Sequence, residues 1–285
     1  MNTRITRVEK KKINPGLLAF EIIMIVLAFI FIYPVLYVLI NSFKPTADII
    51  LNPTGIPLHF TLDNFIKVWT TKGAGGITFP AAVMNTAFLT AVSVAGILLA
   101  SSMAAYILVR TRTKTSNAIF MMFAFFLVIP FQVIMVPLVV MATDMQLKGI
   151  GGLVLMYLGL GTPLAILMYH GFIKNVPVSL EESASIDGAG RWRIFFNIVL
   201  PLLNPITVTI AILDIIWIWN DFLLPYIILR QGTLVLFQFN FFGQFTQDYG
   251  ALTASLVMTS IPVVALYIAL QKFILRGITA GAEKG

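Results

Sequence analysis

The sequence lacks cysteine altogether and contains only two histidines, His59 and His170. Without cysteine, disulfides, thiolate metal sites and cysteine nucleophiles are excluded. The two histidines lie far apart and show no HExxH-type spacing, so we expect no metal site and two solvated side chains. No other nucleophile or cofactor constellation stands out, which argues against a membrane-embedded enzyme.

Charged residues are scarce as well. They make up 11% of the chain, against about 25% in ordinary soluble domains. Hydrophobic residues make up 59%, and the mean hydropathy is +0.93. This composition excludes a water-soluble globule and indicates an integral membrane protein. We therefore attribute the net charge of +7 to the placement of loops beside a membrane rather than to affinity for nucleic acid.

A phosphate-binding loop of the form G-x-x-x-x-G-K-[ST] is also absent from the sequence. We therefore expect that this chain neither binds nor hydrolyses ATP and is not an enzyme. Any nucleotide chemistry would belong to partner chains.

Long apolar runs predict an all-α membrane protein that forms one domain over the whole chain. We expect six spans, roughly at residues 17–40, 81–109, 117–141, 149–170, 202–229 and 251–273. Pro130 and Pro137 are expected to kink the third span, because proline removes a helical hydrogen bond. The stretches 41–80 and 230–250 are predicted to be polar loops, and residues 274–285 a polar tail.

The basic residues are distributed unevenly between the two sides of these spans. Most of the 19 lysines and arginines lie in the N-terminal stretch, the loop after the second span, the segment 171–201 and the tail. The five in the other loops are Lys44, Lys67, Lys72, Lys148 and Arg230. By the positive-inside rule, both termini and the segment 171–201 are expected in the cytoplasm.

This segment is polar where its neighbours are apolar, and it predicts a helix–turn–helix. Ser179 and Glu182 have capping-box spacing, which predicts a helix that begins at Ser179 and ends at Ser185 or Ile186. Gly188 follows where a tight turn requires positive φ. The second helix carries an apolar stripe that consists of Trp192, Phe195, Phe196 and Val199. The prolines expected to form the joint to the next span are Pro201 and Pro205.

Several motifs resemble the permease subunits of ABC importers. Residues 182–189, ESASIDGA, followed by residues 198–201, IVLP, resemble the EAA loop of that family. The longer pattern from residue 177 to 201 resembles its carbohydrate-uptake branch, whose best-known member is the maltose importer. Shorter matches are NSFKP at 41–45, WNDF at 219–222 and GITAGA at 277–282. The match runs through nearly the whole chain, and Ser183 stands where the EAA pattern has its first alanine.

The resemblance implies the type I ABC importer permease fold, with short cytoplasmic coupling helices that contact an ATPase subunit. The residues that it assigns to this coupling are Glu181, Glu182, Ser183, Ala184, Asp187, Gly188, Ala189, Trp192 and Phe195. It assigns a second ATPase contact to the tail residues Gly277, Thr279, Gly281 and Lys284. The alternative is an amphipathic helix that lies on lipid. The acids of this segment argue against that, since such helices favour Lys and Arg.

The resemblance further implies a multi-pass protein of a bacterial or archaeal cell membrane, the inner membrane where there are two. The expected partners are a second, homologous permease subunit, two ATPase subunits that hold ATP and Mg²⁺, and an extracytoplasmic solute-binding protein. We also expect contacts with membrane lipid and a sugar substrate, and neither a cofactor in this chain nor nucleic acid.

Asp214 and Asp221 are the only acids deep inside a predicted span. They are seven positions apart and share a helix face, with Trp217 between them. An acid in hydrocarbon is costly, so both should face protein or water. In one interpretation Trp217, Asn220 and Asp221 line a sugar pathway. In the other, which we favour, the acids belong to a structural hydrogen-bonding cluster. Weaker pathway candidates are Gln132 and Asn85.

The sequence therefore predicts a permease subunit that imports a sugar, with an oligosaccharide favoured, by alternating access. A close alternative is an ABC permease for glycerol-3-phosphate or a polyol, although no predicted span carries deep inside it a cation that a phosphate would need. The alternative from a different class is a secondary transporter in which Asp214 and Asp221 relay protons or bind a cation.

Overall fold

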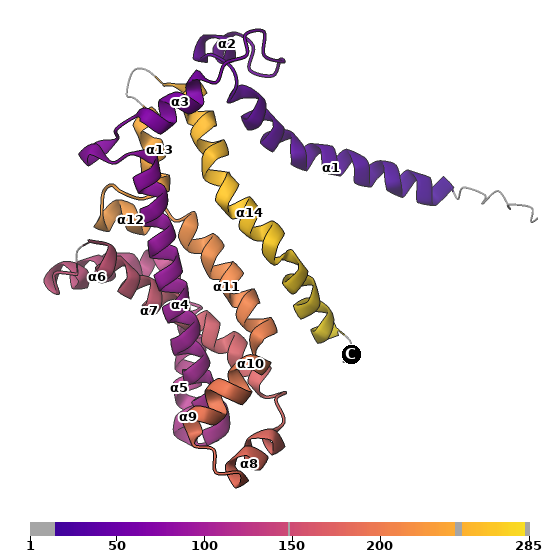
Figure 1. Ribbon diagram of the computed structural model, residues 1–285, viewed down its shortest axis with the longest axis vertical. Coiled ribbons are helices and arrows are strands. Elements are labelled where there is room, and N and C mark those ends of the chain that lie inside the picture. The colour runs from indigo at the N-terminus through magenta and orange to yellow at the C-terminus, as the bar shows by residue number, and fades with distance from the viewer. Residues whose placement is uncertain (1–14, 148, 243–246, 283–285) are drawn as a thin grey trace, which may run out of the picture.

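The protein is described here by a computed structural model that covers residues 15–147, 149–242 and 247–282, with side chains described as far as residue 269. Most of the long helices run roughly along one axis of the molecule (Figure 1). Within these described residues, four helices are long and apolar enough to cross a membrane, and the number rises to six if each of two bent helix pairs counts as one span. This agrees with the six spans expected from the sequence.

The four long helices are α1 (Pro15–Asn41), α4 (Phe79–Thr111), α7 (Gly149–Ile173) and α14 (Tyr249–Ala282). Helix α4 packs along α7, and α14 lies beside a shorter helix, α11 (Asn204–Trp219). Helix α1 instead splays away from the others (Figure 1). None of its most apolar 18-residue window is buried within the chain. A helix that is hydrophobic on all sides and unburied in its own chain needs lipid or another protein around it.

The expected third span, 117–141, is corrected by the structure, because it consists of two helices rather than one kinked helix. These are α5 (Lys114–Phe126) and α6 (Phe131–Asp144), and their axes differ by 103°. Pro130 is the N-cap of α6 and has an extended backbone, and because it lacks an N–H it cannot donate a helical hydrogen bond back toward α5. Pro137 lies inside α6 and does not end it.

The expected fifth span, 202–229, also consists of two helices rather than one. Helix α11 meets the preceding helical stretch, Arg191–Leu202, at an angle of 74°, and the bend falls at Leu203. The predicted joint is therefore confirmed, with Pro205 in the first turn of α11. After Trp219 the chain breaks again before the short helix α12 (Leu223–Ile228).

The two stretches predicted as polar loops contain short helices. These are α2 (Thr46–Leu51), α3 (Asp63–Thr70) and α13 (Leu234–Gln238). Asp248 joins two of them to the start of α14, because it accepts hydrogen bonds from Thr46 and Lys67 as well as from the Ala251 N–H. Burial alone would raise the pKa of the Asp248 carboxyl, but these donors together hold it below its ordinary value.

The C-terminal tail differs from the expected polar extension, because α14 continues helically to Ala282. The proposed tail contacts Gly277, Thr279 and Gly281 therefore lie on the last turns of this helix, in the part whose side chains are not described. Lys284 lies outside the described residues.

The contact between α4 and α7 depends on glycine. A Cβ at Gly161 would lie 2.6 Å from Ile97 Cδ1 and 3.4 Å from the Trp217 ring, and a Cβ at Gly96 would lie 2.9 Å from Leu158 Cδ2. Around these glycines lies the larger buried cluster, whose fully buried large side chains include Leu89, Ile97, Leu153, Tyr157 and Ile166. Small residues at this interface allow the two backbones to approach closely.

We expect Gly161→Val to lower the free energy of unfolding by roughly 1–3 kcal/mol, because the side chain would force Ile97 and Trp217 out of place. Gly159→Val is the matched control in the same helix, where an added Cβ meets nothing within 4 Å. Thermal unfolding of the purified protein in detergent measures both. Equal destabilisation by the two substitutions would contradict the close contact of α4 with α7.

Candidate functional site

The polar segment forms a helix–turn–helix, which we call the elbow segment (residues 178–202). Its first helix, α8 (Val178–Ile186), begins one residue earlier than expected. Pro177 is the N-cap, and no side chain caps the helix, so the predicted capping box of Ser179 and Glu182 is wrong. The fixed φ of Pro177 suits a helix start and places Ser179 inside the first turn. The predicted end at Ile186 is confirmed.

The turn of the elbow segment is a Schellman motif. The Ala189 N–H donates to the Ala184 carbonyl at 2.9 Å, and the Gly188 N–H donates to the Ser185 carbonyl at 3.1 Å. Gly188 has a φ of +81°, so the predicted positive φ is confirmed. Ala184 and Ala189 pack against the buried cluster, which makes the turn a defined structure rather than a free loop.

The second helical stretch of the elbow segment consists of α9 (Arg191–Ile194), a π-helical turn (Phe195–Val199) and α10 (Leu200–Leu202). The predicted apolar stripe does not lie on one buried face. Phe195 and Val199 are buried, whereas Trp192 is 66% exposed and stacks on Phe196. The π-helical turn changes the register of the helix by one residue, which a regular 3.6-residue period does not anticipate.

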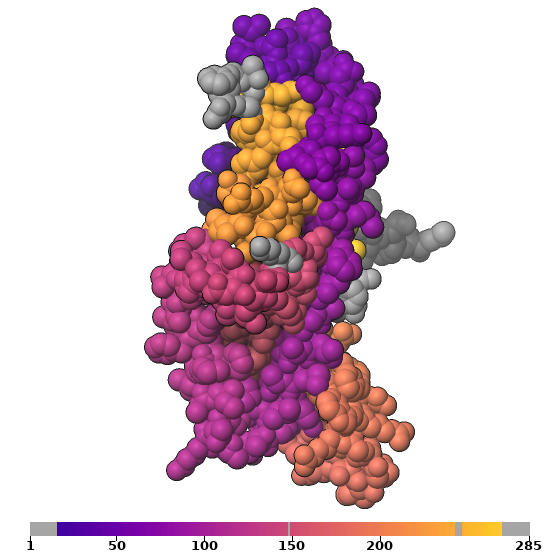
Figure 2. All heavy atoms as spheres, turned by 90° about the vertical axis from the view of Figure 1, so that its left-hand side faces the viewer, coloured from indigo at the N-terminus to yellow at the C-terminus, as the bar shows by residue number. Residues whose placement is uncertain are grey.

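Most of the residues assigned to coupling lie on the outside of this structure. Glu182, Ser183, Asp187, Gly188 and Trp192 are exposed. Ile186 at the tip is 86% exposed, which is high for an isoleucine. Figure 2 shows the elbow segment projecting from the lower end of the molecule. The exposed surface of the elbow segment combines acids with basic and large apolar side chains, among them Glu182, Arg191 and Trp192.

Two of the assigned residues face inward instead. Glu181 is 9% exposed and Phe195 is 3% exposed. The Glu181 carboxylate accepts hydrogen bonds from Tyr106 and Arg110 of α4, and the Phe195 ring lies 5.3 Å from the Tyr106 ring. These two side chains therefore bind the elbow segment to its own chain.

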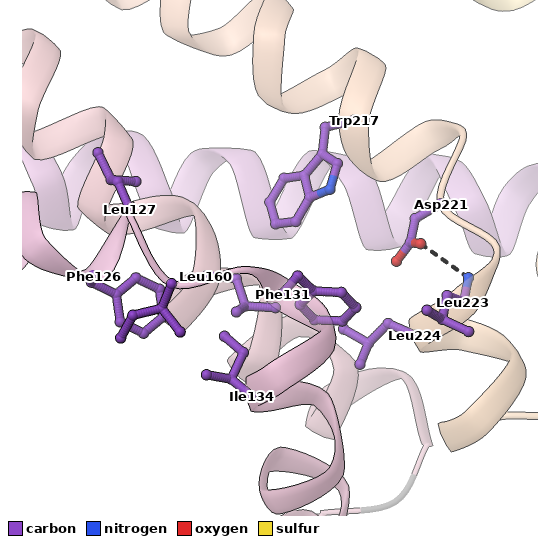
Figure 3. A pocket seen from close by; sticks show the side chains of 10 residues that line it. Phe126, Leu127, Phe131, Ile134, Leu160, Trp217, Asp221, Leu223 and Leu224 are labelled. Carbon is purple, nitrogen blue, oxygen red and sulfur yellow. Dashed lines mark hydrogen bonds between the residues drawn. The ribbon is translucent and has the colours of Figure 1, made fainter.

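A pocket of about 380 Å³ lies where the broken third span meets α7 and α11. Its lining residues are Phe126, Leu127, Ile129, Phe131, Ile134, Leu160, Trp217, Asp221, Leu223 and Leu224. Figure 3 shows Trp217 and Asp221 on one side and the apolar side chains of α5 and α6 on the other. The pocket therefore combines an indole, a carboxylate and an apolar wall.

Asp221 has two protein partners at the edge of this pocket. The Tyr157 hydroxyl donates to its Oδ2 at 2.7 Å, and the Leu223 N–H donates to its Oδ1 at 3.1 Å. The ring of Trp217 meets the Tyr157 ring edge-on, with centroids 5.4 Å apart. Asp221 thus lines the pocket and also stabilises the start of α12, so both interpretations of this residue have support.

The other polar candidates do not join Trp217 and Asp221 in the pocket. Asp214 is 5% exposed, and its Oδ2 has no hydrogen-bond partner among the described residues. Asn220 donates to the Ile216 carbonyl of its own helix. Asn85 donates to the Gly232 carbonyl, which favours the structural interpretation of that residue. Gln132, the last candidate, is an exposed residue of α6.

The prediction of two solvated histidines is half wrong. His59 is exposed and contacts Asp48 at 3.0 Å. His170 is 7% exposed and stacks on Phe120 with ring centroids 3.7 Å apart. Helix α7 extends beyond the predicted span end to Ile173, so His170 lies against α5 rather than at a solvated helix end.

Sequence reasoning missed three residues that complete these regions. Tyr157 holds Asp221, and Tyr106 with Arg110 holds Glu181. The only local signal was a tyrosine hydroxyl or a guanidinium inside or beside an apolar run, where an unpaired polar group is costly. That signal predicts that a partner exists but does not say which residue it is.

The apolar helices, the pocket at a broken span and the projecting elbow segment together define a membrane permease. The chain belongs to the family described as "Binding-protein-dependent transport system inner membrane component", whose model matches residues 93–280. This family is a family of transport permeases, not of enzymes.

Two relatives illustrate the breadth of the match. The chain is 41% identical over 263 residues to the "Probable starch degradation products transport system permease protein AmyC" of Thermoanaerobacterium thermosulfurigenes. The aligned residues cover 91% of this chain and 94% of the relative. It is 36% identical over 258 residues to the "Multiple sugar-binding transport system permease protein MsmG" of Streptococcus mutans, with 88% and 91% coverage.

The fold has a solved counterpart. A chain from the crystal structure of a bacterial ABC transporter involved in the import of the acidic polysaccharide alginate superposes with a TM-score of 0.75. The superposition covers 90% of this chain and 95% of that chain, at 20% sequence identity. The protein therefore has the fold of an ABC importer permease, as the resemblance implied.

We expect Tyr157→Phe to lower the free energy of unfolding by about 1.5–3 kcal/mol, because its hydroxyl donates to a carboxylate. Tyr169→Phe is the matched control on the same helix, since that buried hydroxyl donates to the neutral Thr207 hydroxyl at 2.9 Å. Its loss should cost about 0.5–1.5 kcal/mol. Chemical or thermal unfolding in detergent compares the two. A smaller effect at Tyr157 would show that Asp221 does not depend on this bond.

Proposed function

We propose that this chain is a permease subunit of an ATP-binding-cassette importer that moves a sugar, with an oligosaccharide favoured, into the cytoplasm. The observation that carries the proposal is the elbow segment. It is structured by a Schellman turn, tied to α4 on one side and exposed on the other. A polar, rigid projection at the end of an apolar bundle is suited to transmit a partner's movement to the spans.

The exposed side of the elbow segment is the proposed contact with an ATPase subunit. Its acids Glu182 and Asp187 and its apolar side chains Ile186 and Trp192 would meet that partner, and the end of α14 would add a second contact. Two such ATPases would hold ATP and Mg²⁺, consistent with a sequence that has no phosphate-binding loop. In this proposal the elbow segment and both termini lie in the cytoplasm, and the uneven distribution of the basic residues supports this orientation.

The pocket at Trp217 is the proposed part of the substrate pathway. An indole face suits the apolar face of a pyranose ring, and the Asp221 carboxylate can accept a hydrogen bond from a sugar hydroxyl. The described lining holds no lysine or arginine, which favours a neutral sugar over a phosphorylated one. Names of relatives that refer to starch products and multiple sugars support the same substrate class.

A second permease subunit and an extracytoplasmic solute-binding protein complete the proposed importer. The unburied helix α1 offers an apolar surface for the second permease or for lipid. Transport would proceed by alternating access, in which ATP-driven closure of the ATPases shifts the population of inward-open and outward-open states. Sugar can shift that equilibrium only through different affinities for the two states.

We expect Ile186→Asp to reduce both recovery of the ATPase subunits with the permease and sugar uptake roughly tenfold or more, because it places a charge in an apolar contact. Leu51→Asp is the matched control. That side chain is 83% exposed, near the opposite end of the molecule, and its substitution should leave ATPase recovery unchanged. Affinity purification and uptake by membrane vesicles provide the measurements. Full ATPase recovery and normal uptake with Ile186→Asp would refute the proposal.

We expect Trp217→Ala to raise the sugar concentration needed for half-maximal uptake about tenfold, since stacking on one aromatic ring contributes about 0.5–1.5 kcal/mol beyond buried area. Trp217→Phe should retain most of the affinity. Uptake in vesicles should require ATP and persist in the presence of an uncoupler. Collapse of uptake by an uncoupler would instead identify a proton-coupled transporter, and an unchanged concentration dependence would remove Trp217 from the pathway.

A further inference from the structure

The last turns of α4 contain an ion pair that neither the pocket nor the exposed elbow surface uses. Arg110 contacts the Glu181 carboxylate through Nη2 at 2.7 Å and through Nε at 2.8 Å, and the Tyr106 hydroxyl donates to the other carboxylate oxygen at 2.7 Å. The Glu181 and Arg110 side chains are 11% and 16% exposed. Both oxygens of a nearly buried carboxylate are therefore occupied by α4.

The same two residues of α4 hold the elbow segment at two further points. Arg110 Nη2 also donates to the Val176 carbonyl at 3.0 Å, which fixes the chain just before α8 begins. The Tyr106 ring packs against Phe195 in the second helical stretch. Because Tyr106 and Arg110 are four positions apart, they lie on one face of α4. One helix face thus contacts both halves of the helix–turn–helix.

The opposite end of α4 is attached to a different part of the chain. Asn85 donates to the Gly232 carbonyl at 3.0 Å, and Thr86 accepts a hydrogen bond from the Leu234 N–H at 2.9 Å. Asn85 and Arg110 are 25 positions apart in one helix, which corresponds to roughly 37 Å at 1.5 Å per residue. A displacement of α4 at the elbow segment therefore reaches the loop before α13.

We propose that Glu181 is a positioning residue that fastens the elbow segment to α4, so that the two move as one body and α4 carries the movement across the membrane. The inference rests on the proposed function for the source of that movement. The covalent connection to α11 is less suited to this role, because it passes through a bend of 74° at Leu203. Glu181 would thus act inside the permease, whereas Glu182 beside it faces the ATPase.

The first test measures coupling in the assembled, reconstituted importer. Glu181→Gln retains the shape of the side chain but leaves the half-buried Arg110 guanidinium without a counter-charge, and Tyr106→Phe removes one hydroxyl while keeping the ring on Phe195. We expect Glu181→Gln to lower sugar uptake per ATP hydrolysed about tenfold, corresponding to about 1.4 kcal/mol. Tyr106→Phe should lower it less, and ATP hydrolysis should stay within about twofold of wild type.

Asp144→Asn is the matched carboxylate-to-amide control, on an exposed residue at the end of α6, and should behave as wild type. A merely structural role for Glu181 would reduce the yield of assembled importer and leave the ratio of uptake to hydrolysis unchanged. That result, or a wild-type ratio with Glu181→Gln, would overturn the proposal.

The second test measures the attachment directly, and the absence of native cysteine permits specific labelling. Spin labels at Val92→Cys on α4 and Ser185→Cys on α8 report the distance between the two elements. We expect one narrow distance distribution, unchanged between nucleotide-free and vanadate-trapped wild-type importer, and a broader one with Glu181→Gln. A distance that changes on trapping in the wild type would overturn the proposal.

The two tests distinguish failure of the Glu181 proposal from failure of the proposed function. A wild-type complex without ATP-driven uptake would refute the proposed function. The width of the distance distribution in the purified chain would still decide whether Glu181 fastens α8 to α4.

Discussion

The close packing of α4 on α7 is the contact on which the remaining structure depends. Gly161 allows Ile97 and the Trp217 ring to approach the same point of α7, so three helices meet there. Helix α7 then supplies the Tyr157 hydroxyl that binds Asp221, and α4 supplies the Arg110 side chain that binds the elbow segment. The proposed substrate site and the proposed coupling site are therefore built on the two members of one tightly packed helix pair.

Much of the fold could be predicted from local sequence because its causes are local. Apolar runs longer than 20 residues define the long helices, and Gly188 defines the turn of the elbow segment. The division of the third and fifth spans was not predictable in the same way. A proline indicates that a helix is interrupted, but it does not indicate the angle at which the chain continues, which is 103° after Phe126.

The candidate sites, too, were predictable only where the signal is local. Trp217 and Asp221 could be named from their polarity inside an apolar run. Their partner Tyr157 could not, because it is 64 positions from Asp221 and no sequence pattern connects the two. Glu181 is a clearer example of what a sequence motif does not predict, because the resemblance assigned both Glu181 and Glu182 to contact with the ATPase. The structure buries Glu181 and exposes Glu182, since on a helix adjacent residues point about 100° apart.

The break between α5 and α6 has a consequence for how the molecule is turned in the bilayer. A helix that begins at Phe131, partway along an apolar stretch, has first-turn N–H groups without intrahelical acceptors, and hydrocarbon offers none. The face that contains this break is therefore suited to water, to the chain's own pocket or to another protein chain, and the acyl chains are better accommodated by other faces. One interrupted helix thus restricts the rotation of the whole bundle about the membrane normal.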